Sequence, residues 1–367
     1  MSEKSKICYV LPEYDEKTGS HFFHLYELLD RASRGLDIFL VIERCAGRPD
    51  KFSIPFYCQR FSFPPLRFLE FVLILLRERF RGRRYFYTHY SYYGGLASWL
   101  VTRLLGGTAY YWNCGMPWLY RRPWLEERIF RFILRHTVFV TGTPGIAEEY
   151  RRRYGLKAAR IRILPNWVNV ERFGDTPPKE ECRRQLGLPS DKKIILFVHR
   201  LSRRKGAHLL PEIVAGVTAK QKNAMFVIVG DGPERENLEF RIQNSELHRY
   251  VRLVGEVPHR DLPAYYRVAD VFLLPSEEEG FPHVLLEAAA AGVPFVASDV
   301  GGIREMLPSE FHSWIVPSGK SGVFAAKILE LFGLPLVERD KLELAEQKWV
   351  RQYDVSVVLP EFIGLFK

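Results

Sequence analysis

The sequence predicts an α/β protein with two Rossmann-like domains, each built on a parallel sheet. Short apolar runs alternate with stretches of helical spacing along the whole chain, and this alternation is typical of parallel sheets with helices on both faces. The length of 367 residues is too great for one ordinary core and suits two domains of similar size. Hydrophobic residues make up 47% of the chain, which favours a well-filled interior over broad disorder.

In the first half, the pattern predicts strands at residues 6–11, 37–42, 85–89, 108–112 and 137–141, and helices at 21–33, 95–105 and 144–154. In the second half it predicts strands at 193–198, 225–229, 251–254, 271–274 and 295–297, and helices at 207–217, 234–244, 263–268 and 283–291. Pro165-Asn166 and Thr176-Pro177-Pro178 interrupt the alternation between these two sets. We therefore predict one domain at residues 1–170 and a second at 171–345.

The cysteines argue against a disulfide framework. Their number is odd, and none of them forms a C-x-x-C pair. We therefore expect neither a disulfide framework nor a zinc site. A reducing compartment fits this cysteine usage best. The five are Cys8, Cys45, Cys58, Cys114 and Cys182.

No segment of the sequence is expected to cross a membrane. The N-terminus, MSEKSKICYVLPEY, is charged and leads into a strand without the apolar region of a signal peptide. The longest uninterrupted apolar run, residues 71–76, is far shorter than the roughly 20 residues that span a bilayer. We therefore expect a cytoplasmic protein, soluble or peripheral at the inner face of the cell membrane.

The charge is strongly basic, with a net value of +10 and a pI of about 9.3, and this favours anionic partners. Residues 60–84 hold seven arginines and two glutamates among many apolar residues, which predicts a helix with a broad apolar face and a basic end. Two interpretations are open. The segment is either a core helix with a solvated arginine tail or a helix that docks onto an anionic membrane.

The segment 275–292, PSEEEGFPHVLLEAAAAG, carries the strongest functional signal. A loop with Glu279 and Gly280 follows a strand, and Glu287 comes eight residues after Glu279, in the next helix. Ligands of open α/β sheets lie beyond the carboxyl ends of the strands, and the start of the helix offers N–H groups and a positive dipole end to an anion. Two carboxylates around this turn suit two sets of ligand hydroxyls. By itself the pair is equally consistent with a solvated acidic loop and a glutamate on a helix surface.

A second signal is the segment 197–206, FVHRLSRRKG, where a strand leads into a loop and a helix. Arg200 and Lys205 in this loop suit a diphosphate, because arginine binds it as a planar fork and lysine as a point charge. Arg203 and Arg204 are expected to face solvent. The alternative is surface charge that caps a loop.

A third segment, VGDGP at residues 229–233, lies at another predicted strand end. It lacks the full G-x-G-x-x-G pattern of dinucleotide sites. We interpret it as a tight turn near the site.

Together these segments resemble the retaining glycosyltransferases of the GT-B fold, in particular glycosyltransferase family 4. The resemblance covers about residues 190–320, and the N-terminal half is similar more loosely, through a Gly19-Ser20 loop and ILPNWVNVERF at 163–173. The matching segments are HRLSRRKG, IVGDGPERENL, VRLVGEVPHRDLPAYYRVADVFLLPS, EEEGFPHVLLEAAAAGVPFVAS and DVGGIREML.

The resemblance implies an N-terminal acceptor-binding domain, a C-terminal nucleotide-sugar-binding domain and a segment 346–367 that crosses back to the N-terminal domain. Arg200 and Lys205 would hold the donor diphosphate, Glu279 the sugar hydroxyls and Glu287 the ribose; Arg200, Lys205 and Glu279 are the catalytic candidates. The donor contacts implied in this way are Gly19, Arg200, Lys205, Gly255, Val257, Glu279, Gly280, Phe281, Pro282, Leu285 and Glu287.

The implied reaction transfers a hexosyl group from a nucleoside diphosphate sugar to an acceptor hydroxyl, with retention of configuration and without a metal ion or another cofactor. No Asp-x-Asp motif lies at a suitable strand end. The acceptor is expected to be a saccharide or lipid-linked molecule of a cell-surface glycan or glycolipid. Aromatic and basic residues in the N-terminal half suit such an acceptor: Trp112, Trp118, Tyr120, Arg121, Arg122 and Trp124.

The sequence departs from the family pattern at three places. His199 stands where a glycine is frequent, Pro282 replaces another frequent glycine and lacks an N–H, and Asn113-Cys114 stands where a histidine is frequent after the strand at 108–112. Cys114 is better explained by packing than as a nucleophile. Three histidines are candidates to replace the missing one, although a structural role suits each of them better: His21, His24 and His89.

Two other functions remain open at this point. One is a nucleotide-sugar epimerase of similar architecture, which also needs a diphosphate site. The other is a non-catalytic protein with a basic binding surface. No nucleic-acid motif is present, and the basic residues coincide with the diphosphate-type turn, so nucleic acid is not the expected partner.

Overall fold

The computed structural model describes residues 4–15, 23–47 and 53–367. It divides the chain into two compact units. Unit 1 comprises Met1–Pro165 and Val358–Lys367, and unit 2 comprises Asn166–Val357. The division therefore falls at Pro165, where the sequence pattern breaks, and again at Val357, whereas the sequence analysis placed the boundaries after residues 170 and 345.

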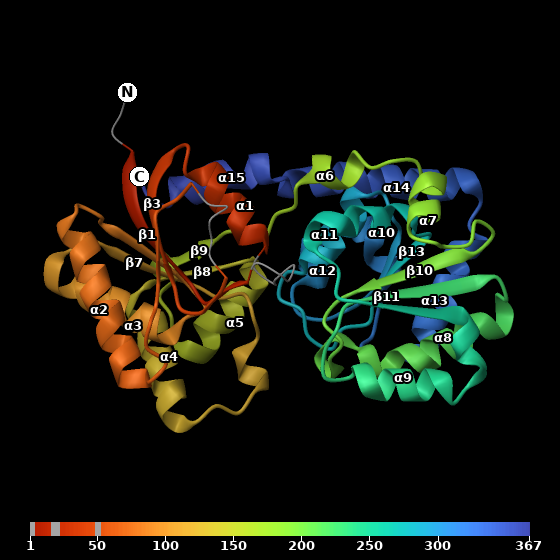
Figure 1. The fold of residues 1–367 in the computed structure, drawn as a ribbon, viewed down its shortest axis with the longest axis horizontal. Helices are drawn as coiled ribbons and strands as arrows, with labels where there is room; N and C mark the ends of the chain where they lie inside the picture. Colours follow the sequence, from red (N-terminus) through yellow and green to blue (C-terminus); the bar gives the residue numbers. More distant parts are fainter. Residues whose placement is uncertain (1–3, 16–22, 48–52) are drawn as a thin grey trace. The chain divides into compact units, whose positions relative to one another are not determined.

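Within the described residues, unit 1 contains a seven-stranded parallel sheet in the order β5-β3-β1-β6-β7-β8-β9 (Figure 1). The strands are β1 (Ser5–Leu11), β3 (Leu36–Ile42), β5 (Phe56–Cys58), β6 (Tyr85–His89), β7 (Thr108–Trp112), β8 (Val138–Thr141) and β9 (Ile161–Ile163), and β2 (Tyr14–Asp15) pairs separately with β4 (Cys45–Ala46). The helices are α1 (Phe23–Ala32), α2 (Pro64–Phe80), α3 (Tyr92–Leu105), α4 (Trp124–His136), α5 (Pro144–Tyr154) and the end of α15 (Val355–Gly364).

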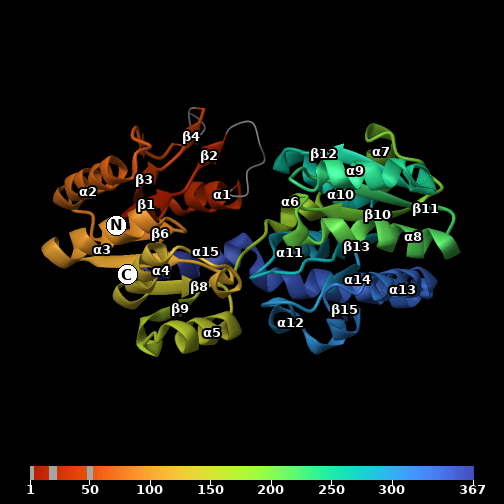
Figure 2. The same ribbon diagram turned by 90° about the horizontal axis from the view of Figure 1, so that it is seen from below.

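Alternation along β1 assigns its side chains to two apolar layers, because successive residues of a strand point to opposite faces. Cys8 and Val10 pack in one cluster with residues of α2 and α3. Tyr9 instead contacts the rings of Tyr87 and Phe362, the latter on α15. Helices therefore cover both faces of this sheet, and the last residues of the chain form part of its core (Figure 2).

Unit 2, as far as it is described, contains a six-stranded parallel sheet in the order β12-β11-β10-β13-β14-β15. The strands are β10 (Lys193–Val198), β11 (Ala224–Val229), β12 (Val251–Gly255), β13 (Val271–Leu274), β14 (Phe295–Ser298) and β15 (Ile315–Val316). The helices are α6 (Val170–Gly174), α7 (Lys179–Gln185), α8 (Leu210–Lys220), α9 (Arg235–Gln243), α10 (Leu262–Val268), α11 (His283–Ala290), α12 (Ile303–Met306), α13 (Ser321–Gly333), α14 (Leu336–Val350) and the start of α15. Both units thus have the predicted Rossmann-like architecture, and none of the helices that the structure describes is long and apolar enough to cross a bilayer.

One disulfide overturns the expectation that the cysteines stay reduced. Cys45 and Cys58 are bonded, with a Cα–Cα distance of 6.1 Å. The register of the sheet explains the pairing, because Cys58 on β5 lies opposite Ile42 at the end of β3, three residues before Cys45. An odd number of cysteines therefore did not exclude a bond, and the argument from cysteine usage for a reducing compartment fails.

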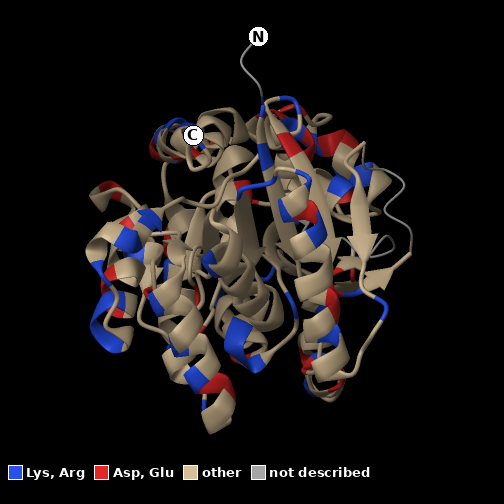
Figure 3. Cartoon of the chain, turned by 90° about the vertical axis from the view of Figure 1, so that its left-hand side faces the viewer, with Lys and Arg blue, Asp and Glu red and all other residues tan. Residues whose placement is uncertain are grey.

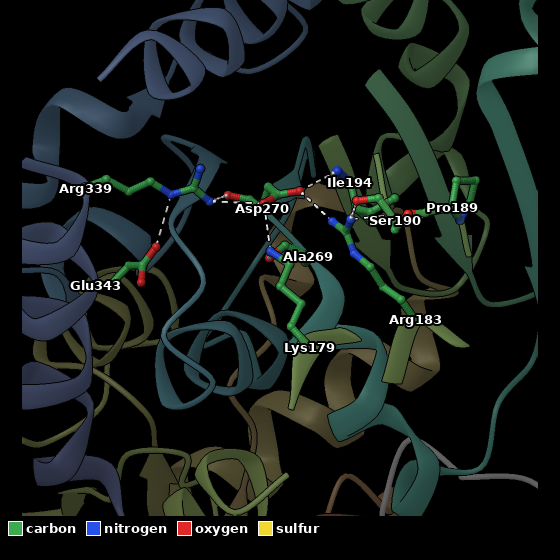
Figure 4. A network of polar contacts seen from close by, with 9 residues as sticks. All are labelled: Lys179, Arg183, Pro189, Ser190, Ile194, Ala269, Asp270, Arg339 and Glu343. Carbon is green, nitrogen blue, oxygen red and sulfur yellow. Dashed lines mark hydrogen bonds and ion pairs between the residues drawn. The ribbon is translucent and has the colours of Figure 1, made fainter. Parts of the chain in front are cut away.

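Asp270 connects the sheet of unit 2 to helices on two sides (Figure 4). Its carboxylate binds Lys179 at 2.7 Å and Arg183 at 3.2 Å, both on α7, and accepts a hydrogen bond from the backbone N–H of Ile194 on β10 at 2.7 Å. Arg339 on α14 donates to the backbone carbonyl of Asp270 at 2.7 Å. The residue thereby fixes the amino ends of β10 and β13 relative to each other.

We expect Asp270→Asn to lower the free energy of unfolding of unit 2 by about 2–4 kcal/mol, because it leaves the buried Arg183 and the partly buried Lys179 without their counter-charge. Chemical denaturation of the whole chain measures the change. Asp191→Asn, at an exposed aspartate, is the matched control and should alter the stability little. Equal stabilities of the two variants would contradict this account of Asp270.

Candidate functional site

The candidate site lies at the carboxyl ends of three adjacent strands of unit 2. In the order β11-β10-β13, each strand is hydrogen-bonded to the next. The loops that follow them are residues 199–206, 230–233 and 275–282. Because carboxyl ends of parallel strands meet at one edge of a sheet, the three predicted segments come together there.

Two glycines, Gly206 and Gly230, let the backbones of these loops touch. A Cβ on Gly206 would lie 2.0 Å from the carbonyl oxygen of Pro275, and one on Gly230 would lie 2.0 Å from that of His199. Gly206 has φ +73° and Gly230 has φ +131°, a region that favours glycine. VGDGP is therefore a structural turn, as interpreted from the sequence, and it packs directly on the loop that carries Arg200.

Glu279 is the centre of the site. Its Oε1 accepts hydrogen bonds from Lys205 Nζ at 2.7 Å, Ser276 Oγ at 2.8 Å and His199 Nε2 at 3.2 Å. Lys205 Nζ also donates to the carbonyl oxygen of Glu278 at 3.3 Å. Both Lys205 and Glu279 are buried. No described residue donates to Glu279 Oε2, so this oxygen is the one that can accept from a ligand.

The charge of Lys205 keeps Glu279 ionised. Burial alone would raise the pKa of this carboxyl, but the cation of Lys205 and the hydrogen bond from His199 outweigh it, and the pKa is held well below its usual range. For His199, burial and the nearby Lys205 lower the pKa of the imidazole. At neutral pH the site therefore contains the ionised carboxylate of Glu279 and the neutral imidazole of His199.

Arg200 differs from Lys205 in being exposed. Its backbone N–H donates to His199 Nδ1 at 2.9 Å, while its guanidinium makes no hydrogen bond or ion pair within the described part of the chain. Arg203 and Arg204 are exposed, as predicted. Arg200 is thus a cation available to a ligand on the same loop that holds the buried Lys205.

Backbone amides complete the anion-binding features. Nothing in the described chain accepts a hydrogen bond from the N–H groups of Gly280 and Phe281, which lie in the loop before α11. Asn166 Nδ2 donates to the carbonyl oxygen of Phe281 at 2.6 Å and so holds this loop. Pro282 is the residue before α11 and supplies no N–H, as expected. The start of α11 with these amides can bind negative charge.

Glu287 is buried in the second turn of α11. Its Oε1 accepts from His259 Nε2 at 2.9 Å, and its Oε2 accepts from the hydroxyl of Tyr266 at 2.8 Å. Burial raises the pKa of this carboxyl, but these two donors more than offset it and lower the pKa. Each carboxylate oxygen can accept a second hydrogen bond, so a ligand hydroxyl would share Glu287 with the protein.

The other predicted residues of unit 2 fall into two groups, one at the carboxyl end of a strand and one with side chains buried in the core. Gly255 and Val257 lie at the carboxyl end of β12, and Gly255 accepts from the N–H of Gly230 at 2.7 Å. Leu285 is fully buried in the core, so its side chain presents no surface to a ligand. Phe281 is also buried, with its ring against Tyr353, and only its backbone is suited to the implied contact.

Several expected contacts belong to unit 1 or fall outside the description. Gly19, Ser20 and His21 lie outside the described residues. His89 is buried and stacks on Trp112 at a centroid distance of 4.0 Å. These contacts fit the structural role that the sequence analysis favoured for His89.

Asn113 and Cys114, which follow β7, are also held inside unit 1. Asn113 Oδ1 accepts from the hydroxyl of Tyr150 at 3.0 Å. Cys114 is buried, in keeping with a packing residue. His24, the remaining candidate, lies on α1.

Sequence reasoning missed the residues that hold the two glutamates. His199 was noted only as a departure from the family pattern, and Ser276, His259 and Tyr266 were not singled out. The signal was present in part, since Ser276 lies three residues before Glu279, and His259 lies in a segment that already matched the family. Their contacts with the glutamates depend on how three loops meet, which no local pattern shows.

Comparison with known families gives a match in each half of the chain. Residues 178–349 match the sequence model of Glycosyl transferases group 1, and residues 18–172 match that of Glycosyltransferase Family 4. Together the matches extend over most of both units. The site of Glu279 and Lys205 lies within the first of them.

Curated relatives include a glycosyltransferase assigned to teichuronic acid biosynthesis, TuaC of Bacillus subtilis strain 168. It is 34% identical over 191 residues, which are 52% of this chain and 46% of the relative. A phosphatidyl-myo-inositol mannosyltransferase of Mycobacterium leprae is 30% identical over 250 residues, which are 67% of this chain and 61% of the relative. The chain spans about half the length of the curated relatives it matches.

Among solved structures, the Anabaena protein HepE in complex with UDP and glucose is similar with a TM-score of 0.81. The match covers 98% of this chain and 99% of HepE, at 16% identity. A likeness at this identity shows the fold, which is the GT-B fold of two Rossmann-like domains.

We expect the stability of unit 2 to fall as the pH drops from about 6.5 to about 4, because of His283. This residue opens α11, and its Nδ1 donates to the carbonyl oxygen of Trp167 at 2.9 Å. Burial lowers the pKa of His283 to about 4. In the unfolded chain the pKa of His283 has its ordinary value of about 6.5. As the pH falls, the unfolded state therefore binds the proton first and is stabilised relative to the folded state.

Denaturation midpoints measured across this pH range check the expectation. His283→Gln keeps an N–H donor and should make the profile flatter between pH 6.5 and 4. His248→Gln, at an exposed histidine, should leave the profile unchanged. A parent profile as flat as that of His283→Gln would refute this role.

Proposed function

Because the chain belongs to the glycosyl transferases group 1 family, we propose that it is a retaining glycosyltransferase with a nucleoside diphosphate sugar as donor. It transfers a hexosyl group to an acceptor hydroxyl in the synthesis of a cell-surface glycan or glycolipid. Among described residues, the observation that carries the proposal is the meeting of a buried Lys205–Glu279 pair, an exposed Arg200 and two unengaged backbone amides at one sheet edge.

The donor would bind by its charge and its hydroxyls. Arg200, Lys205 and the amides of Gly280 and Phe281 suit the diphosphate. Glu279 Oε2 suits hydroxyls of the sugar, and Glu287 suits those of the ribose. The base would lie near Gly255 and Val257, at the carboxyl end of the neighbouring strand.

The reaction breaks the bond between the anomeric carbon and the diphosphate oxygen and forms a bond from that carbon to the acceptor oxygen. Negative charge develops on the leaving diphosphate and positive charge on the sugar ring. Arg200 and Lys205 stabilise the first, and the fixed carboxylate of Glu279 is placed to favour the second. The acceptor attacks on the face from which the diphosphate leaves, and the donor phosphate takes the acceptor proton.

We propose that this reaction needs no metal ion, because the two basic side chains and the amides are placed to carry the charge of the diphosphate. The acceptor proposal draws support from the names of the relatives, a phosphatidyl-myo-inositol mannosyltransferase and a teichuronic acid glycosyltransferase. A saccharide or lipid-linked acceptor of this kind would suit a protein that is peripheral at the inner face of the cell membrane.

The first experiment is a thermal-shift panel with UDP, GDP, ADP and their sugars, in buffer with a chelator. A ligand that binds the folded chain raises its melting temperature. Hydrolysis of the donor without acceptor, measured in the same buffer, then reports turnover. Absence of any shift and of any turnover across the panel would overturn the proposal.

We expect Arg200→Ala to weaken binding of the selected nucleoside diphosphate by roughly tenfold to a hundredfold, because it removes a charge-assisted contact. The melting temperature without ligand should stay unchanged, since the guanidinium is exposed. Arg203→Ala, three residues along the same loop and also exposed, is the matched control. Isothermal titration checks both, and equal affinities of the two variants would remove Arg200 from the site.

A further inference from the structure

The outward face of α2 is apolar, contrary to the usual pattern of a surface helix. Phe71, Ile74 and Leu75 pack in the core of unit 1. On the opposite side, four large apolar side chains face solvent. They are Leu66, Leu69, Leu73 and Phe80, which are 43%, 52%, 58% and 77% exposed.

Their spacing of three, four and seven residues aligns these four side chains in one stripe. At a rise of 1.5 Å per residue, the stripe is roughly 21 Å long. Phe61 and Phe63, just before the helix, are also exposed. By helical spacing the exposed Arg77 lies on the same line, between Leu73 and Phe80. Exposed apolar residues that occur singly need no explanation, but several that align on one helix face mark a contact surface.

The two acidic residues of this segment do not reach the surface. Glu70 is buried and accepts hydrogen bonds from the hydroxyl of Tyr57 at 2.8 Å and the backbone N–H of Arg60 at 3.0 Å. Glu78 is buried and forms ion pairs with Arg77, Arg81 and Arg83, each at 3.0 Å.

The exposed charge of this segment is therefore basic. Residues 60–84 carry a net charge of +5, and exposed arginines lie before, within and after the stripe, at Arg60, Arg77, Arg81 and Arg84. Figure 3 shows basic residues in blue and acidic residues in red on the helices that face the viewer.

We propose that the stripe Leu66-Leu69-Leu73-Phe80 docks unit 1 onto the surface of an anionic lipid bilayer. The apolar side chains enter the boundary between headgroups and acyl chains, and the arginines neutralise lipid phosphates. A helix of 17 residues with arginines at its end lies along the surface and does not span it. A second copy of the chain fits less well, because two such faces would bring like charges together.

The docking surface deepens the proposed function, because it brings unit 1 to the place where a lipid-linked acceptor would be found. The sequence left open whether residues 60–84 form a core helix or a membrane-docking helix, and this proposal combines both. The segment is a core helix on its inward face, and the docking surface is its outward face.

Vesicle flotation tests the proposal without depending on enzyme activity. The whole chain should float with vesicles that contain about 30% phosphatidylglycerol in phosphatidylcholine, and much less with phosphatidylcholine alone. Leu69→Glu with Leu73→Glu should reduce binding to the anionic vesicles at least tenfold. Leu336→Glu with Leu344→Glu, at two exposed leucines of α14, is the matched control and should bind as the parent does.

A double arginine variant distinguishes binding to lipid phosphates from nonspecific hydrophobic binding. Arg60→Gln with Arg84→Gln should weaken binding to anionic vesicles and leave the weak binding to neutral vesicles unchanged. Light scattering reports the oligomeric state in parallel. Failure of the parent to float, equal loss in the α14 control, or a dimer that Leu69→Glu with Leu73→Glu dissociates would each overturn the lipid assignment.

Failure of this proposal and failure of the proposed function are distinguishable. A chain that turns over nucleotide sugars but does not bind vesicles loses only the docking surface. A chain that binds vesicles through α2 but neither binds nor turns over nucleotide sugars keeps the docking surface and loses the proposed function.

Discussion

The ion pair between Lys205 and Glu279 is the interaction on which the rest of the candidate site depends. Both groups are buried, and a buried charge is strongly unfavourable unless it is paired and hydrogen-bonded. Ser276 and His199 add two further donors to the same carboxylate oxygen. Removal of either charge would leave the other without compensation, so the pair depends on the loops 199–206 and 275–282 keeping their places.

Contacts at the amino ends of β10 and β13 hold the loops at the carboxyl ends of these strands in position. Asp270 joins the amino end of β13 to that of β10 through the backbone of Ile194. The register Ile195–Val271 and Leu196–Phe272 follows, and the two strands then deliver His199 and Glu279 to the same edge. The network in Figure 4 lies at the amino ends of β10 and β13, and the site lies at the carboxyl ends of the same two strands.

Local pattern predicted the central strands and the edge strand β12 well, but it missed the three shortest edge strands. The apolar runs at 193–198 and 271–274 coincide with β10 and β13, because buried parallel strands are apolar on both faces. The edge strands β5, β9 and β15 have two or three residues each, too few to show a period, and they were missed. The register that brings Cys45 to Cys58 depends on one of these edge strands, which explains why the disulfide was missed as well.

For the site, the sequence identified the charged residues but not their partners. Lys205 and Glu279 were predicted one by one, from a strand-to-helix turn and from a glycine-containing loop. Their direct contact, and the way His199 joins both loops, are consequences of sheet order. Leu285 was predicted from its place next to functional positions on α11, and its side chain is buried in the core.

The glycine contacts set a limit on how this chain can diverge. At Gly206, Gly230 and Gly232, any larger residue would place its Cβ within 2.4 Å of a neighbouring backbone oxygen, so the main chain itself would have to move. Arg203 and Arg204, just before Gly206, are instead exposed to solvent. Substitutions at these two arginines leave the backbone contacts of the loop in place, whereas substitutions at the three glycines would force the main chain to move.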